Sequence, residues 1–123
     1  METLTFTIDG PAVAKQRPRL GGRYRSGGSW RRAVFTPQKT RDYEGKVANA
    51  FFVKYGNKKL TGQLAVELVF YLKSRGRADI DNLIKSVLDG LKEVFNDRQV
   101  VAIKAFLLVG GGERTEVNIL LYT

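Results

Sequence analysis

The feature that most limits the possible folds is a regular alternation of apolar residues in the middle of the chain. Leu64, Val66, Leu68, Phe70 and Leu72 occupy every second position. Because successive side chains of a strand point to opposite faces, this pattern predicts a β-strand with one buried face. One strand cannot bury that face alone, so the rest of the chain must supply further strands and a covering layer.

The other apolar patterns supply those partners. Apolar residues three and four positions apart predict helices over residues 40–55 and 80–95. Alternation and apolar runs predict further strands over residues 3–8, 99–109 and 115–122. Three consecutive glycines separate the last two strands, which we expect to form an antiparallel hairpin.

The chain shows neither an internal repeat nor a domain boundary. We therefore expect one domain over residues 1–123, of the α+β (mixed α/β) class. Its expected order is strand, basic loop, helix, strand, helix, strand, strand. Two helices then cover one face of a sheet of about four strands.

The composition excludes several kinds of site. Histidine and cysteine are both absent, which excludes Ser-His-Asp triads, histidine-metal nuclease motifs, thiolate zinc sites and disulfides. Hydrolytic chemistry would have to use carboxylates, lysine, hydroxyls or a metal ion. The chain has no signal-peptide pattern and no apolar run long enough for a membrane span, so we expect a cytoplasmic protein without membrane contact.

The charge balance points to a polyanionic partner. Lys and Arg number 21 against 12 Asp and Glu, a net charge of +9, which favours nucleic acid. The excess is concentrated at about residues 14–35, which contain four glycines and no acid. Such a segment cannot offset its ordering entropy by burial, so we expect a mobile basic loop there. The candidate DNA-binding residues are Lys15, Arg17, Arg19, Arg23, Arg25, Arg31, Arg32 and, ahead of the second helix, Arg77.

Aromatic residues are interleaved with the arginines of this loop. Tyr24, Trp30 and Phe35 could stack on unpaired bases. Packing beneath the loop explains them equally well, and the sequence does not distinguish the two interpretations.

An acidic cluster is the candidate for chemistry. Asp79 and Asp81 lie between a strand and a helix, and Asp97 lies in the turn after that helix. Carboxylates two residues apart in an extended segment point the same way and are hard oxygen ligands suited to Mg²⁺. Capping of the helix N-terminus explains the first two acids as well. Asp97 joins them only if the flanking strands pair antiparallel or with an offset, because side-by-side parallel strands put the two connections at opposite ends of the helix.

Lys85 lies four residues after Asp81 and four before Asp89. These three residues share one helix face, away from the apolar stripe. One interpretation is a solvated series of salt bridges. The other places the Lys85 ammonium beside the acids, where it holds the scissile phosphate or supports the attacking water.

Several segments together resemble the RusA family of Holliday junction resolvases. The central one reads Arg77-Ala-Asp79-Ile-Asp81-Asn82-Leu83-Ile-Lys85-Ser-Val-Leu-Asp89-Gly90-Leu91, and it continues with Asn96-Asp97-Arg-Gln99-Val100-Val101. The N-terminal half contributes Gly10-Pro11, Lys15-Gln-Arg17-Pro18-Arg19 and Thr36-Pro37-Gln-Lys39-Thr40-Arg-Asp-Tyr43. The resemblance covers nearly the whole chain.

The resemblance implies a homodimeric endonuclease that makes paired nicks in four-way DNA junctions with Mg²⁺, for which Mn²⁺ can substitute, in DNA recombination and repair. The family's metal-binding acids fall on Asp79, Asp81 and Asp97, and its catalytic lysine falls on Lys85. Asp89 matches a family acid as a possible additional site residue. The family also implies a bacterial cell or a phage-infected host. One position departs from the family pattern, since Asn96 stands where many members have a second acid.

The alternative function is a non-catalytic basic nucleic-acid-binding protein. It explains the net charge of +9 equally well. It gives no reason for three acids next to the helix ends of a protein that must hold phosphate.

Overall fold

The computed structural model describes residues 2–16, 19–76 and 78–122. Its elements are β1 (Glu2–Asp9), β2 (Arg19–Ser26), β3 (Ser29–Phe35), α1 (Gln38–Tyr55), β4 (Gln63–Leu72), α2 (Ile80–Gly90), a 3-10 turn (Asp97–Gln99), β5 (Val100–Val109) and β6 (Arg114–Tyr122). In this described part of the chain, neither α1 nor α2 has the length and apolar character needed to cross a membrane.

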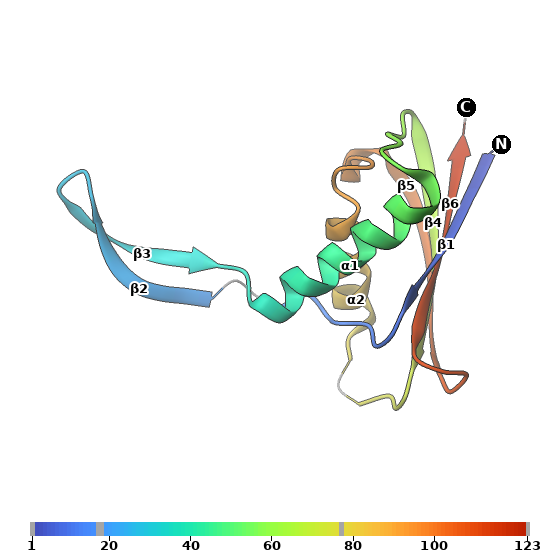
Figure 1. The fold of residues 1–123 in the computed structure, drawn as a ribbon, viewed down its shortest axis with the longest axis horizontal. Coiled ribbons are helices and arrows are strands. Elements are labelled where there is room, and N and C mark those ends of the chain that lie inside the picture. Colours follow the sequence, from blue (N-terminus) through green and yellow to red (C-terminus); the bar gives the residue numbers. More distant parts are fainter. Residues whose placement is uncertain (1, 17–18, 77, 123) are drawn as a thin grey trace.

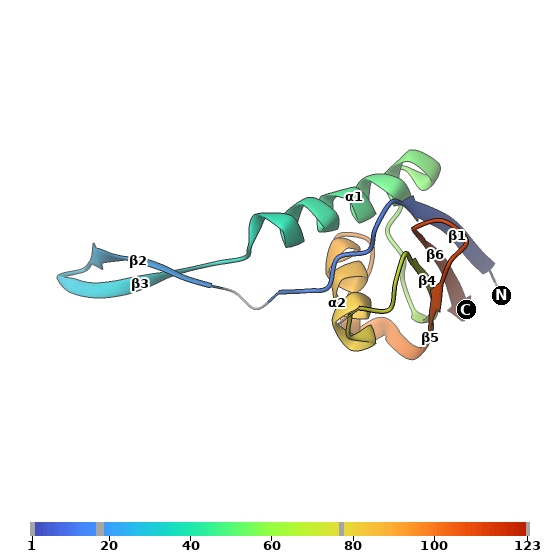
Figure 2. The same cartoon turned by 90° about the horizontal axis from the view of Figure 1, so that it is seen from below.

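Four strands form one mixed sheet in the order β1-β6-β4-β5. The β1–β6 and β6–β4 pairs are antiparallel, whereas β4 and β5 are parallel. Both helices lie on the same face of this sheet, α1 over the β1 side and α2 over the β5 side (Figures 1 and 2). The predicted α+β class, with two helices covering a four-stranded sheet, is confirmed.

The predicted hairpin between the last two strands is wrong, because β4 lies between β5 and β6. Parallel neighbours need a crossover connection, and α2 provides it, so β4, α2 and β5 form a βαβ unit. β6 then pairs on the other side of β4. The glycine-rich link after β5 passes the end of β4, where the Gly110 amide donates to the Leu72 carbonyl at 2.9 Å.

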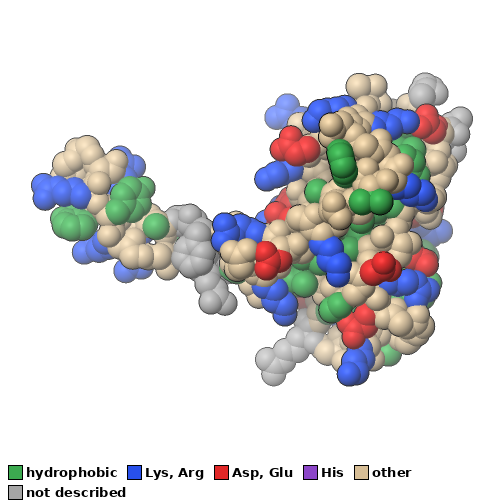
Figure 3. All heavy atoms as spheres, in the orientation of Figure 1, with side chains coloured by type: hydrophobic (Ala, Val, Ile, Leu, Met, Phe, Trp, Pro, Cys, Tyr) green, Lys and Arg blue, Asp and Glu red, His purple; other side chains and the backbone are tan. Residues whose placement is uncertain are grey.

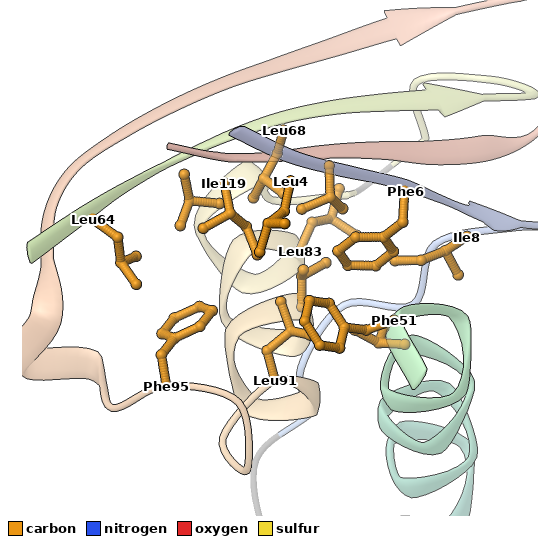
Figure 4. Packing of buried hydrophobic residues seen from close by; sticks show 14 of the residues in the cluster. Leu4, Phe6, Ile8, Phe51, Leu64, Leu68, Leu83, Leu91, Phe95 and Ile119 are labelled. Atoms are coloured by element: carbon orange, nitrogen blue, oxygen red, sulfur yellow. The ribbon is translucent and has the colours of Figure 1, made fainter. Parts of the chain in front are cut away.

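The core fills the space between the sheet and the two helices (Figure 4). Alternate residues of β4 point into it, as the sequence predicts, and Leu64, Leu68 and Phe70 are fully buried. Phe51 of α1 meets the Phe6 ring edge-on, with the ring centroids 5.6 Å apart. This shared core fixes the position of α2 and therefore of the acids at its two ends.

The second helix ends earlier than its apolar spacing predicts. α2 stops at Gly90, although Leu91 and Phe95 remain buried. A Cβ at Gly90 would lie 2.7 Å from the Cβ of Val47 and 3.0 Å from the Glu44 carbonyl. Gly90 is thus the point of close approach between the helices. The chain turns there while continuing to fill the core.

Residues 19–35 form regular structure where the sequence predicts an irregular loop. β2 and β3 pair antiparallel, and their hairpin, hereafter the arm, projects away from the body (Figure 1). Gly27 and Gly28 connect the strands with φ of 57° and 81°. Two consecutive positive-φ residues are what a tight hairpin turn requires. The glycine pair was therefore a turn signal rather than a sign of disorder.

Candidate active site and nucleic-acid interface

Asp79 and Asp81 lie at the start of α2, and both are exposed. Asp79 has extended backbone angles, and its carbonyl accepts from the Leu83 amide at 3.1 Å. Its carboxylate makes no capping hydrogen bond to the helix. The capping interpretation therefore does not explain Asp79. Among the described residues, no ion pair is found for either carboxylate, so both can take part in binding a ligand.

Asp97 begins the 3-10 turn beyond the other end of α2 and is also exposed. Asn96 caps this turn. Its side-chain oxygen accepts from the Arg98 amide at 2.9 Å, and the Gln99 side chain accepts from the Asn96 amide at 2.7 Å. Asn96, which departs from the pattern that the resemblance implies, thus shapes the turn carrying Asp97.

Gln99 also ties this turn to the body. Its side-chain amide donates to the carbonyls of Leu60 and Gly62 at 2.9 and 3.0 Å. Analysis of the sequence missed this positioning role. The available signal was the asparagine with a glutamine three residues later, which is a capping-box spacing.

The three acids are not gathered within one chain. β4 and β5 are parallel, which is the pairing that leaves the two connections of α2 at opposite ends of the helix. Across its 11 residues, α2 spans about 16 Å. Within residues 2–16, 19–76 and 78–122, no group of three acidic side chains could hold a metal ion.

The fit to Mg²⁺ is therefore partial. Carboxylate oxygens are the donors that Mg²⁺ prefers, and it takes few protein ligands. One chain offers Asp79 and Asp81 at one end of α2 and Asp97 at the other. A site that uses all three acids needs a second chain.

Lys85 is exposed on α2 between the acids. No ion pair found among the described residues includes it. The predicted series of salt bridges along the helix is therefore absent there. The Lys85 ammonium can approach a bound phosphate.

Asp89 pairs with Lys15 instead. The Lys15 ammonium lies 2.6 Å from Glu44 of α1 and 3.1 Å from Asp89 of α2, and its side chain is only 17% exposed. Burial alone would lower the pKa of Lys15, but the hydrogen bonds and charges of the two carboxylates outweigh it and leave the pKa raised. Lys15 thus joins the two helices through these ion pairs, and its contact with DNA stays a prediction.

The segment before the arm is anchored along α2 by further hydrogen bonds. The Lys15 amide donates to the Asn82 carbonyl at 2.9 Å, and the buried Ser86 hydroxyl donates to the Val13 carbonyl at 2.5 Å. The approach to the arm therefore runs beside the helix that carries Asp81. These contacts were not foreseen, because they join residues far apart in the sequence.

The arm carries exposed basic and aromatic side chains (Figure 3). Arg23, Arg25, Arg31 and Arg32 are all exposed. Trp30 and Tyr24 are 62% and 48% exposed, so they do not pack beneath a loop. Arg17 and Arg77, and the side chains of Arg19 and Phe35, lie outside what the structure describes. The arm thus offers positive charge and stacking surfaces beyond the body, as nucleic-acid binding requires.

Comparison with known proteins agrees with the resemblance. The family model described as endodeoxyribonuclease RusA matches residues 9–120. In a direct comparison, no curated protein matches the chain. The matched range includes the arm, both helices and all three acids.

Proposed function

Because the chain belongs to the RusA family of endodeoxyribonucleases, we propose that it resolves four-way DNA junctions as a homodimer, by paired Mg²⁺-dependent nicks, in DNA recombination and repair. The observation that carries this proposal is the exposed pair of carboxylates at the start of α2, for which no ion pair is found in the part of the chain that the structure describes. Asp79 and Asp81 are exposed, and Asp79 has no capping role in a chain of net charge +9. In a protein that only bound DNA, two exposed acids would lower the affinity for the phosphate backbone.

The homodimer completes the acidic site. Asp97 of the partner subunit joins Asp79 and Asp81 of the first, and the two-fold axis repeats the arrangement on the other side. Two equivalent sites suit a four-way junction, whose approximate two-fold symmetry calls for symmetric cuts. The parallel pairing of β4 and β5 supports a site shared between two subunits, because it keeps Asp97 apart from Asp79 and Asp81 within one chain.

Each residue has a defined task in this proposal. Asp79, Asp81 and the partner's Asp97 hold the ion, and Mg²⁺ or Mn²⁺ when bound supplies Lewis acidity for phosphodiester hydrolysis. Lys85, one helical turn after Asp81, orients the scissile phosphate and balances its charge. Asp89 acts at a distance, by holding Lys15 against both helices.

The arm supplies affinity rather than chemistry. Its arginines neutralise phosphates without reading sequence, and Tyr24 and Trp30 stack on bases that are unpaired near the crossover. Replacing Arg23, Arg25, Arg31 and Arg32 with alanine should weaken junction binding. The slope of log affinity against log salt should fall by about 0.9 per lost phosphate contact. An unchanged slope would show that the arginines of the arm do not contact DNA phosphates.

The function is tested with four substrates: a four-way junction, a flap, a linear duplex and RNA, each with and without Mg²⁺. We expect symmetric nicks in the junction only, and only with the ion. Cleavage of the flap or RNA in preference would indicate a different nuclease. Tight binding of the junction without any cleavage would favour the non-catalytic alternative.

Mixing two inactive variants tests the shared site. Asp81→Asn and Asp97→Asn should each be inactive. In a heterodimer of the two, one site has both substitutions and the other has neither. Random mixing should therefore restore about a quarter of the wild-type sites, as single-strand nicks. If each site were built from one chain, no mixture would regain activity.

A further inference from the structure

The segment that leads from β1 to the arm lies against both helices. Residues 12–16, hereafter the strap, begin with three apolar residues that pack against the core. The Lys15 side chain follows, with its ion pairs to Glu44 of α1 and Asp89 of α2. A segment with contacts to the core and to two helices is held in place with them. The strap is therefore part of the packed body and is not a free linker to the arm.

Ser86 fastens the strap to the middle of α2. This side chain is fully buried, and its hydroxyl donates to the Val13 carbonyl of the strap at 2.5 Å. A serine inside a helix commonly bonds back to the carbonyl four residues earlier. That contact, to the Asn82 carbonyl, is the longer of the two at 3.2 Å. The hydroxyl thus serves the contact between the helix and the strap more than the helix itself.

The strap also holds the first turn of α2, where the candidate metal ligands lie. The Lys15 amide donates to the Asn82 carbonyl at 2.9 Å, and Asn82 directly follows Asp81. The first amides of a helix have no partner within it, so an end without a cap opens easily. Asp79 is the N-cap residue here, and its side chain makes no capping hydrogen bond. The strap therefore restrains from the side a turn that its own N-cap residue does not secure.

We propose that the strap positions the two acids at the start of α2, and that Ser86 is its positioning residue. The proposal rests on the proposed function, which assigns Asp79 and Asp81 to the metal ion. Groups that act on a bound substrate must be held within about 0.5 Å of their productive geometry. Both acids are exposed, so the backbone of the turn has to supply that precision. Ser86 contacts neither metal nor DNA. It holds the strap against α2, and the strap holds the turn.

A second buried hydroxyl provides a matched comparison. Thr115 of β6 is also fully buried, and its hydroxyl lies 3.2 Å from that of Tyr43 on α1. That hydrogen bond joins the sheet to α1 and involves no residue of the strap. Ser86→Ala and Thr115→Val each remove one buried hydroxyl with little change of shape. Alanine is also the best helix former, so Ser86→Ala should fold, and melting curves by circular dichroism check both variants.

Steady-state cleavage of a four-way junction in Mg²⁺ separates positioning from stability. For Ser86→Ala we expect kcat to fall about tenfold, within the range seen when supporting partners of metal ligands are removed. KM should stay within about twofold, because the arm keeps all its arginines for phosphate contacts. Thr115→Val, assayed below its melting range, should keep the wild-type kcat. A wild-type kcat in folded Ser86→Ala, or an equal loss of kcat in both variants, would overturn the proposal.

Hydrogen exchange tests the strap without relying on cleavage. The Leu83 amide donates to the Asp79 carbonyl at 3.1 Å and so reports on opening of the first turn. Its exchange, followed by NMR, should be about tenfold faster in Ser86→Ala than in wild type and unchanged in Thr115→Val. An unchanged rate in Ser86→Ala would overturn the proposal, whatever the cleavage assay gives. A wild-type protein that cuts no junction, with faster exchange in Ser86→Ala, would refute the proposed function while supporting the hold of the strap on this turn.

Discussion

The two ends of α2 carry acids in different structural settings. At the first end, Asp79 and Asp81 depend only on where the helix begins, and no tertiary hydrogen bond of their side chains is found among the described residues. At the second end, Asp97 sits on a turn that Asn96 and Gln99 cap and that Gln99 fastens to two carbonyls of the body. The first end of α2 thus carries two exposed acids, whereas the acid at the second end lies on a turn that several hydrogen bonds hold in place.

The first end of α2 is therefore expected to serve catalysis, whereas the turn at the second end also stabilises the fold. Substitutions at the first end should change catalysis and leave stability alone. At the second end, the acid and its support should respond separately.

The largest effect is expected at the first end. Asp81→Asn removes a ligand charge and keeps the shape of the side chain. Cleavage of a junction in Mg²⁺ should fall more than about 100-fold, since even groups that only support metal ligands cost 10- to 100-fold. Junction affinity, measured in Ca²⁺, should hold or rise, because one negative charge is lost.

The control for this variant is Glu93→Gln, which removes an exposed acid beyond the end of α2. It should cut the junction at the wild-type rate. Equal rates of junction cleavage for Asp81→Asn and Glu93→Gln would show that Asp81 is not part of the active site.

The second effect concerns the point where α2 ends. Gly90→Ala would place a Cβ 2.7 Å from Val47 and 3.0 Å from a backbone carbonyl of α1. Overpacking of this kind costs about 1–3 kcal/mol, and we expect the upper part of that range because backbone must move. Denaturant unfolding measures the loss.

The matched control is Gly45→Ala, in the middle of α1, where an added Cβ meets nothing within 4 Å. There alanine should stabilise the protein by about 0.5–1 kcal/mol. Stabilisation by both substitutions would show that the helices do not meet at Gly90.

The third effect separates Asp97 from its support. Gln99→Ala removes the hydrogen bonds to Asn96, Leu60 and Gly62 and should lower the free energy of unfolding by about 2 kcal/mol. Asp97→Asn, at an exposed position, should leave it within about 0.5 kcal/mol and still abolish cleavage. Gln63→Ala, an exposed glutamine at the start of β4, is the neutral control. A stability loss in Asp97→Asn would mean that the acid itself supports the turn.

Much of the fold follows from local sequence patterns. The alternation in β4 and the helical spacing in α1 predict their positions, because burial of one face is set by residues close together in the chain. The order of the strands does not follow in this way. β6 pairs with β4, on the side of β4 opposite to β5, rather than forming a hairpin with β5. This choice depends on contacts between distant parts of the chain.

The candidate site shows the same limit. Asp79, Asp81 and Asp97 stand out as acids in a basic chain, so the sequence identifies them as candidates. Their separation depends on the parallel pairing of β4 and β5, which no short pattern encodes. The ion pairs of Lys15 with Glu44 and Asp89 likewise depend on how the two helices meet. The arm was missed for a local reason, since its charge and glycine content hid a hairpin turn.

The smallest predicted effect lies between the two ends of α2, where Lys15 joins that helix to α1. Lys15→Met keeps the length of the side chain and removes the ion pairs, and it should cost about 1 kcal/mol at pH 8, since the groups are partly exposed. The pKa of Lys15 is raised above 10.5 in the folded protein. The contribution of these pairs is therefore present in full below pH 10.5 and is lost as pH rises through the folded pKa.

The stability gap between wild type and Lys15→Met, from urea unfolding, should thus narrow above pH 10.5. The raised pKa of buried Tyr43 weakens both proteins in the same alkaline range, so it cancels in the difference. A gap that stays constant to pH 12 would mean that Lys15 stabilises the junction of the helices by packing alone. In that case Asp89 would be free to act with the acids at either end of α2.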